Sequence, residues 1–248
     1  MLLPLWQHLP DLPTSWPTLN ELNQWLPPGV ISGGGQDILF VEQVRSMAAL
    51  DYERHILETG QIPTRPGCWH DFFNAAMWIC FPHSKARLNW IHVSQGSEDQ
   101  PNRRGPARNA ATLLDESGVV VATLHPWMAR ANADHRWRQL LVEARESWHA
   151  TALPLLLGHG LAEQCLVPYP GMTARAVYLT VDPALLDLPG PERLAAVDRL
   201  LCQRLQSPIT PSDFPPLPIL GIPGWDPANA DPGFYDNIRV FRPGRQPG

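Results

Sequence analysis

Residues 68–92, CWHDFFNAAMWICFPHSKARLNWIH, predict two consecutive helices and thereby favour a fold built on helical packing. At about 100° per residue, the apolar side chains of the first part share one helical face. They are Phe72, Phe73, Ala76 and Cys80. The residue before a proline avoids helical geometry, so Phe81-Pro82 predicts a break after this first helix. A second helix is expected over residues 84–93.

The polar side chains of both helices indicate where a functional site would lie. Opposite the apolar face of the first helix are His70, Asp71 and Asn74, beside Trp78. In the second helix, polar residues recur at i, i+4 and i+7 and form one stripe: Lys85, Asn89 and His92. A polar face of this kind lines a pocket or packs through a hydrogen-bonded layer. A further alternative is that His70 or Asp71 satisfies free backbone N–H groups at the helix N-terminus.

Lys85 is the sole lysine of the chain, since arginine supplies the rest of its 19 basic residues. An ammonium is a compact charge that can lose its proton, and a planar guanidinium reproduces neither property. This favours a functional Lys85 over a lysine that survives by chance on a solvated face. The candidate catalytic residues are therefore His70, Asp71 and Lys85. The candidate substrate-binding residues are Asn74, Asn89, His92 and Arg108.

A second motif, GHGLAEQ at residues 158–164, follows an expected strand and turns into a helix. His159 and Glu163, at i and i+4, would supply two ligands to one divalent metal, although an ordinary His–Glu hydrogen bond explains the spacing equally well. Arg108 precedes an apolar run and would bind a carboxylate or phosphate bidentately. Its structural alternative is an ion pair with Asp71 or Asp115.

The remaining elements mix helices and strands without βαβ alternation, which is typical of an α+β protein. Residues 111–123, ATLLDESGVVVAT, predict a β-hairpin that turns around Glu116. Asp134 is expected to be the N-cap of a helix with Trp137 and Trp148 on its buried face. The other expected strands are 153–157 and 174–182, and the other expected helices are 38–59, 158–166 and 191–205.

We therefore expect one globular domain over residues 1–248, with a small, mostly antiparallel sheet packed by several helices. The Pro-rich N-terminal and C-terminal segments would wrap the core. The tail from Ser207 to Pro243 in particular contains more aromatic residues than disordered tails do, so it is expected to be ordered.

Composition narrows the classes of function. The net charge of −5 and the pI near 6.0 provide no basic field, so a small-molecule or anionic substrate is favoured over nucleic acid. No segment approaches the ~20 apolar residues of a membrane span, and the N-terminal segment lacks the features of a signal peptide. A cytoplasmic protein that does not bind membranes is expected, with four reduced cysteines because no CxxC pair occurs.

Several motifs in a fixed order carry a resemblance to a known family: WHDFFNAAMW, RGPARNAATLLDESG, GHGLAEQ, PLPILGIPGW and FYDNIRVFRP. Over about residues 15–243 the chain resembles the mainly proteobacterial family catalogued as domain of unknown function 3025. The positions that match the family pattern are Trp69, His70, Asp71, Asn74, Lys85, Asn89, Arg108, Asp115 and His159. Asn109 stands where an aspartate is common. The resemblance implies a single intracellular domain and implies no activity.

The leading hypothesis is a metal-assisted hydrolase that acts on an anionic small molecule or a phosphoester. His70 and Asp71 would meet His159 and Glu163 around a divalent metal, which requires the two histidines to lie within ~10 Å of each other. Two alternatives stay open. One is a non-catalytic binding module for a protein or RNA partner, which would use the arginine-rich segment 103–108. The other is a buried polar network that only fixes the fold.

Overall fold

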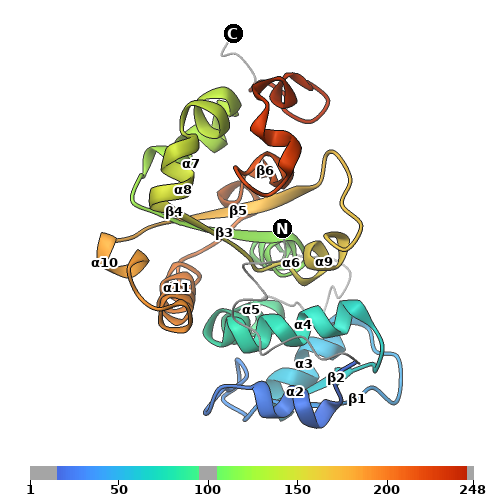
Figure 1. Ribbon diagram of the computed structural model, residues 1–248. Helices are drawn as coiled ribbons and strands as arrows, with labels where there is room; N and C mark the ends of the chain where they lie inside the picture. The colour runs from blue at the N-terminus through green and yellow to red at the C-terminus, as the bar shows by residue number, and fades with distance from the viewer. Residues whose placement is uncertain (1–15, 95–104, 245–248) are drawn as a thin grey trace.

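A four-stranded mixed sheet crosses the middle of the molecule and separates two groups of helices (Figure 1). The computed structural model describes residues 16–94 and 105–244. The strand order is β4-β3-β5-β6, in which β3 pairs antiparallel with β4 and parallel with β5, and β5 pairs antiparallel with β6. The strands are β3 (Gly118–Thr123), β4 (Ala152–Leu156), β5 (Thr173–Thr180) and β6 (Pro216–Pro218). The α+β class and the mostly antiparallel main sheet are thus confirmed.

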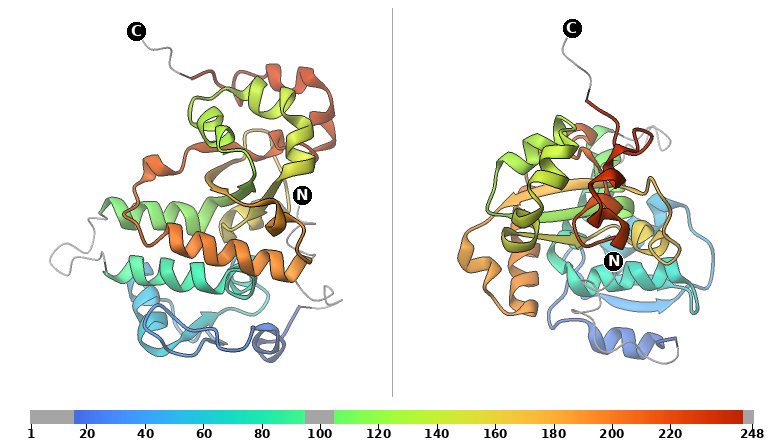
Figure 2. Two further views of the ribbon diagram at one scale, coloured as in Figure 1. Left: turned by 90° about the vertical axis from the view of Figure 1, so that its left-hand side faces the viewer. Right: turned by 45° about the horizontal axis from the view of Figure 1, so that its top comes forward.

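The first half of the chain forms a helical layer on one side of this sheet (Figure 1). It comprises α2 (Leu19–Trp25), α3 (Ala49–Thr59), α4 (Trp69–Cys80), α5 (Pro82–Ser94) and the parallel pair β1 (Leu39–Glu42) and β2 (Gln61–Thr64). Between this layer and the sheet lie α6 (Pro106–Ser117) and α9 (His159–Gln164). Helix α11 (Gly190–Arg204) packs beside α5, which also contacts α6 (Figure 2, left).

The other side of the sheet is covered by α7 (Trp127–Ala133), a π-helical turn (Arg138–Glu143), α8 (Arg145–Thr151) and the C-terminal tail (Figure 2, right). The tail contains the short 3₁₀ helices Pro211–Asp213, Ile219–Gly221, Pro227–Ala230 and Pro232–Asp236, and α10 (Pro183–Leu186) precedes α11. Trp225, Tyr235 and Phe241 of the tail are buried, which confirms that it is ordered. Of the Pro-rich N-terminal segment, residues 1–36, the first 15 lie outside the described residues, and the rest includes α2 and contributes Leu22 and Val30 to the core.

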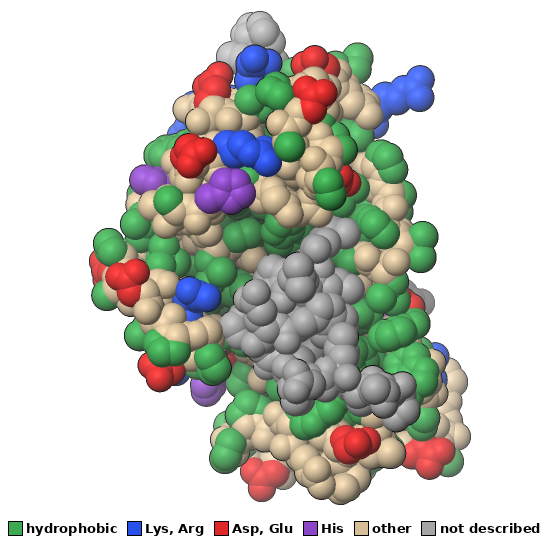
Figure 3. Space-filling model, viewed as in Figure 1, with side chains coloured by type: hydrophobic (Ala, Val, Ile, Leu, Met, Phe, Trp, Pro, Cys, Tyr) green, Lys and Arg blue, Asp and Glu red, His purple; other side chains and the backbone are tan. Residues whose placement is uncertain are grey.

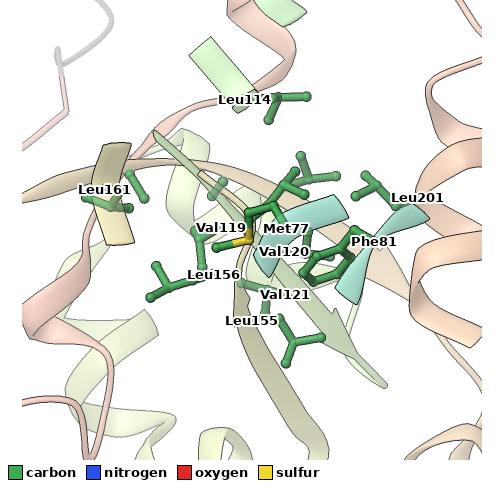
Figure 4. Packing of buried hydrophobic residues seen from close by; sticks show 14 of the residues in the cluster. Met77, Phe81, Leu114, Val119, Val120, Val121, Leu155, Leu156, Leu161 and Leu201 are labelled. Atoms are coloured by element: carbon green, nitrogen blue, oxygen red, sulfur yellow. The ribbon is translucent and has the colours of Figure 1, made fainter. Parts of the chain in front are cut away.

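The core is centred on β3, whose three valines, Val119–Val121, are fully buried. As a central strand β3 has no solvated face, so β-branched residues follow one another instead of alternating with polar ones. Figure 4 shows Met77 and Phe81 of the α4 region, Leu161 of α9 and Leu201 of α11 converging on it with residues of β4. The strand therefore ties the two halves of the chain to one core.

The helix break at Phe81-Pro82 is confirmed, because Phe81 leaves helical geometry and α5 begins at Pro82. The predicted strands at 153–157 and 174–182 are confirmed as β4 and β5. The helices predicted at 158–166 and 191–205 are confirmed as α9 and α11.

The β-hairpin predicted over residues 111–123 is wrong. Residues 111–117 belong to α6, which begins with Pro106 at its first position and runs without a loop into β3. Pro is favoured at that helical position, and Ala110, Ala111, Leu114 and Asp115 form one buried helical face. The apolar residues before Glu116 thus belong to the end of a helix, and those after it belong to a strand. Glu116 itself lies in the last helical turn instead of at a hairpin tip.

Two other expectations need correction. The helix predicted over 38–59 begins only at Ala49, because Leu39–Glu42 pairs with β2 as a strand. Asp134 is the C-cap of α7 and not an N-cap, and His135 after it adopts a left-handed φ of 55° before the chain turns into the π-helix. The aromatic face predicted there is nevertheless buried, with Trp137 and Trp148 in the core.

The distribution of charged side chains on the surface agrees with the absence of a basic field in the sequence. On the face in Figure 3, Lys and Arg side chains of the described residues lie scattered among acidic and hydrophobic ones. All four cysteines are free. Within residues 16–94 and 105–244, no helix combines the length and hydrophobicity that crossing a membrane requires.

Candidate functional site

A cavity of about 320 Å³ lies where α3, α4 and α5 face the C-terminal end of α6 and the start of α9. Six of the residues singled out in the sequence line it: His70, Asp71, Asn74, Lys85, Asn89 and His159. The other three candidates, His92, Arg108 and Glu163, are not among its described lining residues. The two polar helical stripes and the GHG motif therefore share one cavity.

The two histidines of this cavity contact each other directly. His70 Nε2 lies 3.1 Å from His159 Nε2, and their rings meet edge to face at 74°. The condition of ~10 Å set by the metal hypothesis is thereby met. Two facing imidazole nitrogens at this distance need a proton or another cation between them, because two lone pairs would repel.

Glu163 fixes the orientation of His70. Its Oε2 lies 3.1 Å from His70 Nδ1, so the carboxylate accepts the Nδ1–H and leaves the Nε2 lone pair of a neutral ring directed at His159. Glu163 thus contacts Nδ1 of His70, on the side of the ring that faces away from His159. Its contact in the structure orients His70, and its predicted role as a metal ligand beside His159 stays a prediction.

His159 is a neutral imidazole at physiological pH. Burial, at 5% exposure, lowers its pKa to about 4, although the Asp115 carboxylate opposes this shift. Its Nδ1 lies 3.9 Å from Asp115 Oδ1 and makes no hydrogen bond of ordinary geometry among the described residues. A neutral ring offers a lone pair to a metal, which a protonated ring does not.

Glu116 completes a three-membered group at this end of the cavity. Its Oε1 lies 3.6 Å from His159 Nε2. One ligand atom from each of His70, Glu116 and His159 lies within 4.8 Å of the other two. Burial and the nearby charge of Asp115 raise the pKa of Glu116. A carboxylate that resists ionisation for these reasons gains from a cation placed beside it.

The glycines of the GHG motif allow His159 to approach α6. A Cβ at Gly158 would lie 2.4 Å from the main-chain nitrogen of Gly118. A Cβ at Gly160 would lie 2.6 Å from Glu116 Oε2. The contact at Gly158 is with backbone atoms, so the start of α9 can pack against the end of α6 only without a side chain there, whereas at Gly160 the Glu116 side chain would have to shift.

Lys85 is a buried cation in the lining of the cavity. Its Nζ donates to Asp115 Oδ1 at 2.5 Å and to Asn74 Oδ1 at 2.9 Å, and Asn74 in turn donates to the Tyr52 hydroxyl at 3.0 Å. Lys85 is only 4% exposed, which contradicts the reading of a lysine on a solvated face. Burial tends to raise the pKa of Asp115, but the Lys85 ammonium, with His159 and His92, lowers it well below its usual range.

Asp71 is held by a neighbouring arginine. Arg65 Nε and Nη2 donate to its two carboxylate oxygens at 2.9 and 2.7 Å, and the Arg65 main-chain N–H donates at 2.7 Å. Burial alone would raise the pKa of Asp71, and these bonds lower it instead. Asp71 is therefore an ionised partner of Arg65, and its predicted catalytic role stays a prediction.

Asn89, Glu53 and His92 form a second group behind Lys85. Asn89 donates to the main-chain and side-chain oxygens of Glu53 at 2.8 Å each, and accepts from Gly33 N at 3.2 Å. Ligand atoms of Glu53, His92 and Asp115 also lie within 4.8 Å of one another. The ammonium of Lys85 already contacts Asp115 there, so this second group has its cation within the chain.

Arg108 lies apart from the cavity. It is buried at 6% exposure in the first turn of α6, about two helical turns before Asp115. Residues 103 and 104 of the arginine-rich segment fall outside the described residues. Arg108 is not among the described residues that line this cavity, and its predicted role in substrate binding stays a prediction.

A comparison with protein-family models finds one match, to the family described as "Protein of unknown function (DUF3025)", over residues 38–245. The chain belongs to this family. The matched range includes every described residue that lines the cavity, from Gln43 to His159. No curated protein and no solved structure matches the chain.

Sequence reasoning missed four residues that line this DUF3025 cavity: Tyr52, Glu53, Arg65 and Glu116. Glu116 was assigned to a turn, although the Pro106 start and the buried spacing of α6 were signals that it ends a helix next to Asp115. Arg65 stands only six residues before Asp71, and this short separation in sequence was a signal that the two side chains could form an ion pair. For Tyr52 and Glu53, no local pattern indicated a pocket.

Proposed function

We propose that the protein is a metal-assisted hydrolase whose divalent metal is held by His70, His159 and Glu116. The observation that carries this proposal is the 3.1 Å approach of two imidazole nitrogens beside a carboxylate oxygen, inside a cavity. Two ligands about 2.0–2.1 Å from one tetrahedral ion lie about 3.3 Å apart. Small side-chain shifts would therefore bring both nitrogens to a single ion.

The surroundings of the three ligands support the same conclusion. A carboxylate that accepts the outer N–H of a ligating histidine is a recurrent feature of metal sites, and Glu163 occupies that position on His70. His159 is neutral because of its burial, so it needs no deprotonation before binding. A dication would also stabilise the ionised form of Glu116, which burial disfavours.

The three proposed ligands would leave a coordination position of the metal free for water or substrate. Three protein ligands leave a coordination position open, where a bound metal lowers the pKa of water to about 7 and polarises a carbonyl or phosphoryl oxygen. The overall reaction adds water to an ester, amide or phosphoester, breaks the bond to the leaving group and transfers a proton to it. In this proposal Lys85 and Asp71, which form ion pairs with Asp115 and Arg65, shape the cavity around the reacting groups.

Metal content of purified protein tests the ligand assignment. After chelation, reloading with Zn²⁺ or Mn²⁺ and desalting, we expect one ion per chain. His70→Gln and Glu116→Gln should weaken binding at least tenfold. His125→Gln, which changes a histidine outside the described cavity lining, is the matched control and should retain one ion. Wild-type protein that retains no metal, or equal retention by His70→Gln, contradicts the assignment.

Turnover tests the reaction class separately. Hydrolysis of p-nitrophenyl esters and phosphates should disappear with chelator, return with added metal, and be lost in Glu116→Gln. Turnover that is insensitive to chelator would contradict the role of the metal. Salt-dependent RNA binding by a protein that retains no metal would instead support the binding-module alternative.

A further inference from the structure

The charges that line the cavity do not balance. Four carboxylates line it, from Glu53, Asp71, Asp115 and Glu116, against two basic side chains, Arg65 and Lys85, so the formal sum is 2 − 4 = −2 with neutral histidines. A cavity with excess negative charge concentrates cations and repels anions. If a divalent ion sits on His70, His159 and Glu116 as proposed above, the cavity as a whole becomes neutral (−2 + 2 = 0), but its charges are still unevenly distributed.

Both basic groups are already committed. Arg65 forms a two-pronged pair with Asp71, at 2.9 and 2.7 Å. Lys85 donates to Asp115 and Asn74. An anionic substrate, as expected from the sequence, would meet no uncommitted basic side chain among the described residues of the lining.

Glu53, unlike these two basic groups, lines the cavity without an ion pair of its own within residues 16–94 and 105–244. Its carboxylate lines the cavity and accepts a hydrogen bond from the Asn89 amide, which carries no charge. Within the described part of the chain, it forms no ion pair with a basic side chain. Glu53 therefore offers a carboxylate on the cavity wall that has no ion-pair partner of its own among the described residues, beside the Lys85–Asp115 pair.

Two aromatic rings also line the cavity. Tyr52, next to Glu53 in α3, and Trp78 of α4 both line it, and the Lys85 ammonium already lies 5.6 Å from the centre of the Trp78 ring. Ring faces attract cations, and a carboxylate with aromatic walls is a common way to bind an ammonium group. The pKa of the Tyr52 hydroxyl is raised by burial and by the negative charges of Glu53, Asp71 and Asp115.

We propose that the cavity binds a small molecule that carries a protonated amine, with the ammonium against Glu53 and beside Tyr52 and Trp78. For the reaction, this inference rests on the proposed hydrolase function, since the amine would be one end of a substrate whose ester or amide reaches the ligand cluster. For binding, it rests only on the cavity lining. The metal-free protein therefore tests it independently.

Three four-carbon probes show which ligand charge the cavity prefers: cationic butylamine, anionic butyrate and neutral butan-1-ol. Their dissociation constants are measured by ligand-observed NMR on chelator-treated protein at pH 7. We expect butylamine to bind at least tenfold more tightly than butyrate and more tightly than the alcohol. Equal or tighter binding of butyrate overturns the proposal, and this wild-type ranking needs no variant.

Glu53→Gln then locates the ammonium. The glutamine oxygen still accepts from Asn89, so the fold should persist, and the melting temperature checks this. The preference for butylamine should disappear in Glu53→Gln and survive in Glu143→Gln, an exposed position with the same change of charge. A preference unchanged in Glu53→Gln, or equally lost in Glu143→Gln, overturns the assignment. Loss of metal binding in His70→Gln with the amine preference intact would keep the two proposals distinct.

Discussion

Substitution of Lys85 by methionine would test the buried ion pair at the centre of the cavity. Methionine preserves most of the side-chain volume but removes the ammonium 2.5 Å from Asp115. Both side chains are at most 10% exposed, so water cannot replace the lost charge. Removal of one member of a buried pair costs about 3–5 kcal/mol. For a chain of this size that corresponds to a fall in melting temperature of about 6–20 °C.

The pH dependence gives a second signature of the same substitution. In the wild type, the pKa of Asp115 is lowered, so its contribution to stability is present above about pH 4 and is lost as pH falls through the lowered value. In Lys85→Met, burial is no longer opposed by the ammonium and raises this pKa. The variant carboxyl then takes up a proton on folding, so the loss of stability should be larger at pH 8 than at pH 5.

Urea unfolding at both pH values measures these differences, with Lys85→Met/Asp115→Asn as the matched control. The double variant has no buried unpaired charge and should recover much of the loss. The reasoning is refuted if Lys85→Met costs less than about 1 kcal/mol, or if the double variant is as unstable as the sum of the two single variants.

Three other predictions concern the same cavity. Because the pKa of His159 is about 4 in the folded chain and ordinarily near 6.5, stability should fall by about 3 kcal/mol as pH drops from 7 to 4, and a His159→Gln variant should lack this component in pH-dependent urea unfolding. In Gly160→Ala, the Glu116 carboxylate must move by about 0.8 Å to reach an ordinary contact, which should weaken metal binding in titration calorimetry at least tenfold while stability changes little. Asp71→Ala should destabilise by about 1–3 kcal/mol in thermal unfolding, since the Arg65 main-chain N–H loses its bond to a buried carboxylate. Arg65→Ala should cost less because that side chain is 54% exposed.

Local patterns in the sequence predicted local structure well. The Phe81-Pro82 break, the GHG turn into α9 and the buried strands followed from rules that involve only neighbouring residues. The failure at residues 111–123 has a physical cause, because a short apolar run fits a buried helix or a strand equally well. Only the packing of α6 under β3 decides between them, and that packing involves distant residues.

The candidate site could be predicted only in part for a similar reason. His70 and His159 were named from their own motifs, but their contact joins residues 89 positions apart and depends on the order of the strands between them. Glu53 carries no motif and enters the cavity only because α3 packs on α5. Side chains that matter through topology alone, without an unusual local pattern, are invisible to a single sequence.

The pairing of Lys85 with Asp115 also constrains how the chain reaches its folded state. The N-terminal helical layer, residues 16–94, emerges first from the ribosome and contains the lysine but not its counter-ion. Full packing of α4 and α5 at that stage would bury an ammonium without a partner, which is costly. A truncated chain that ends at residue 94 should therefore remain loosely packed. During synthesis, α4 and α5 can pack fully only after α6 has been made.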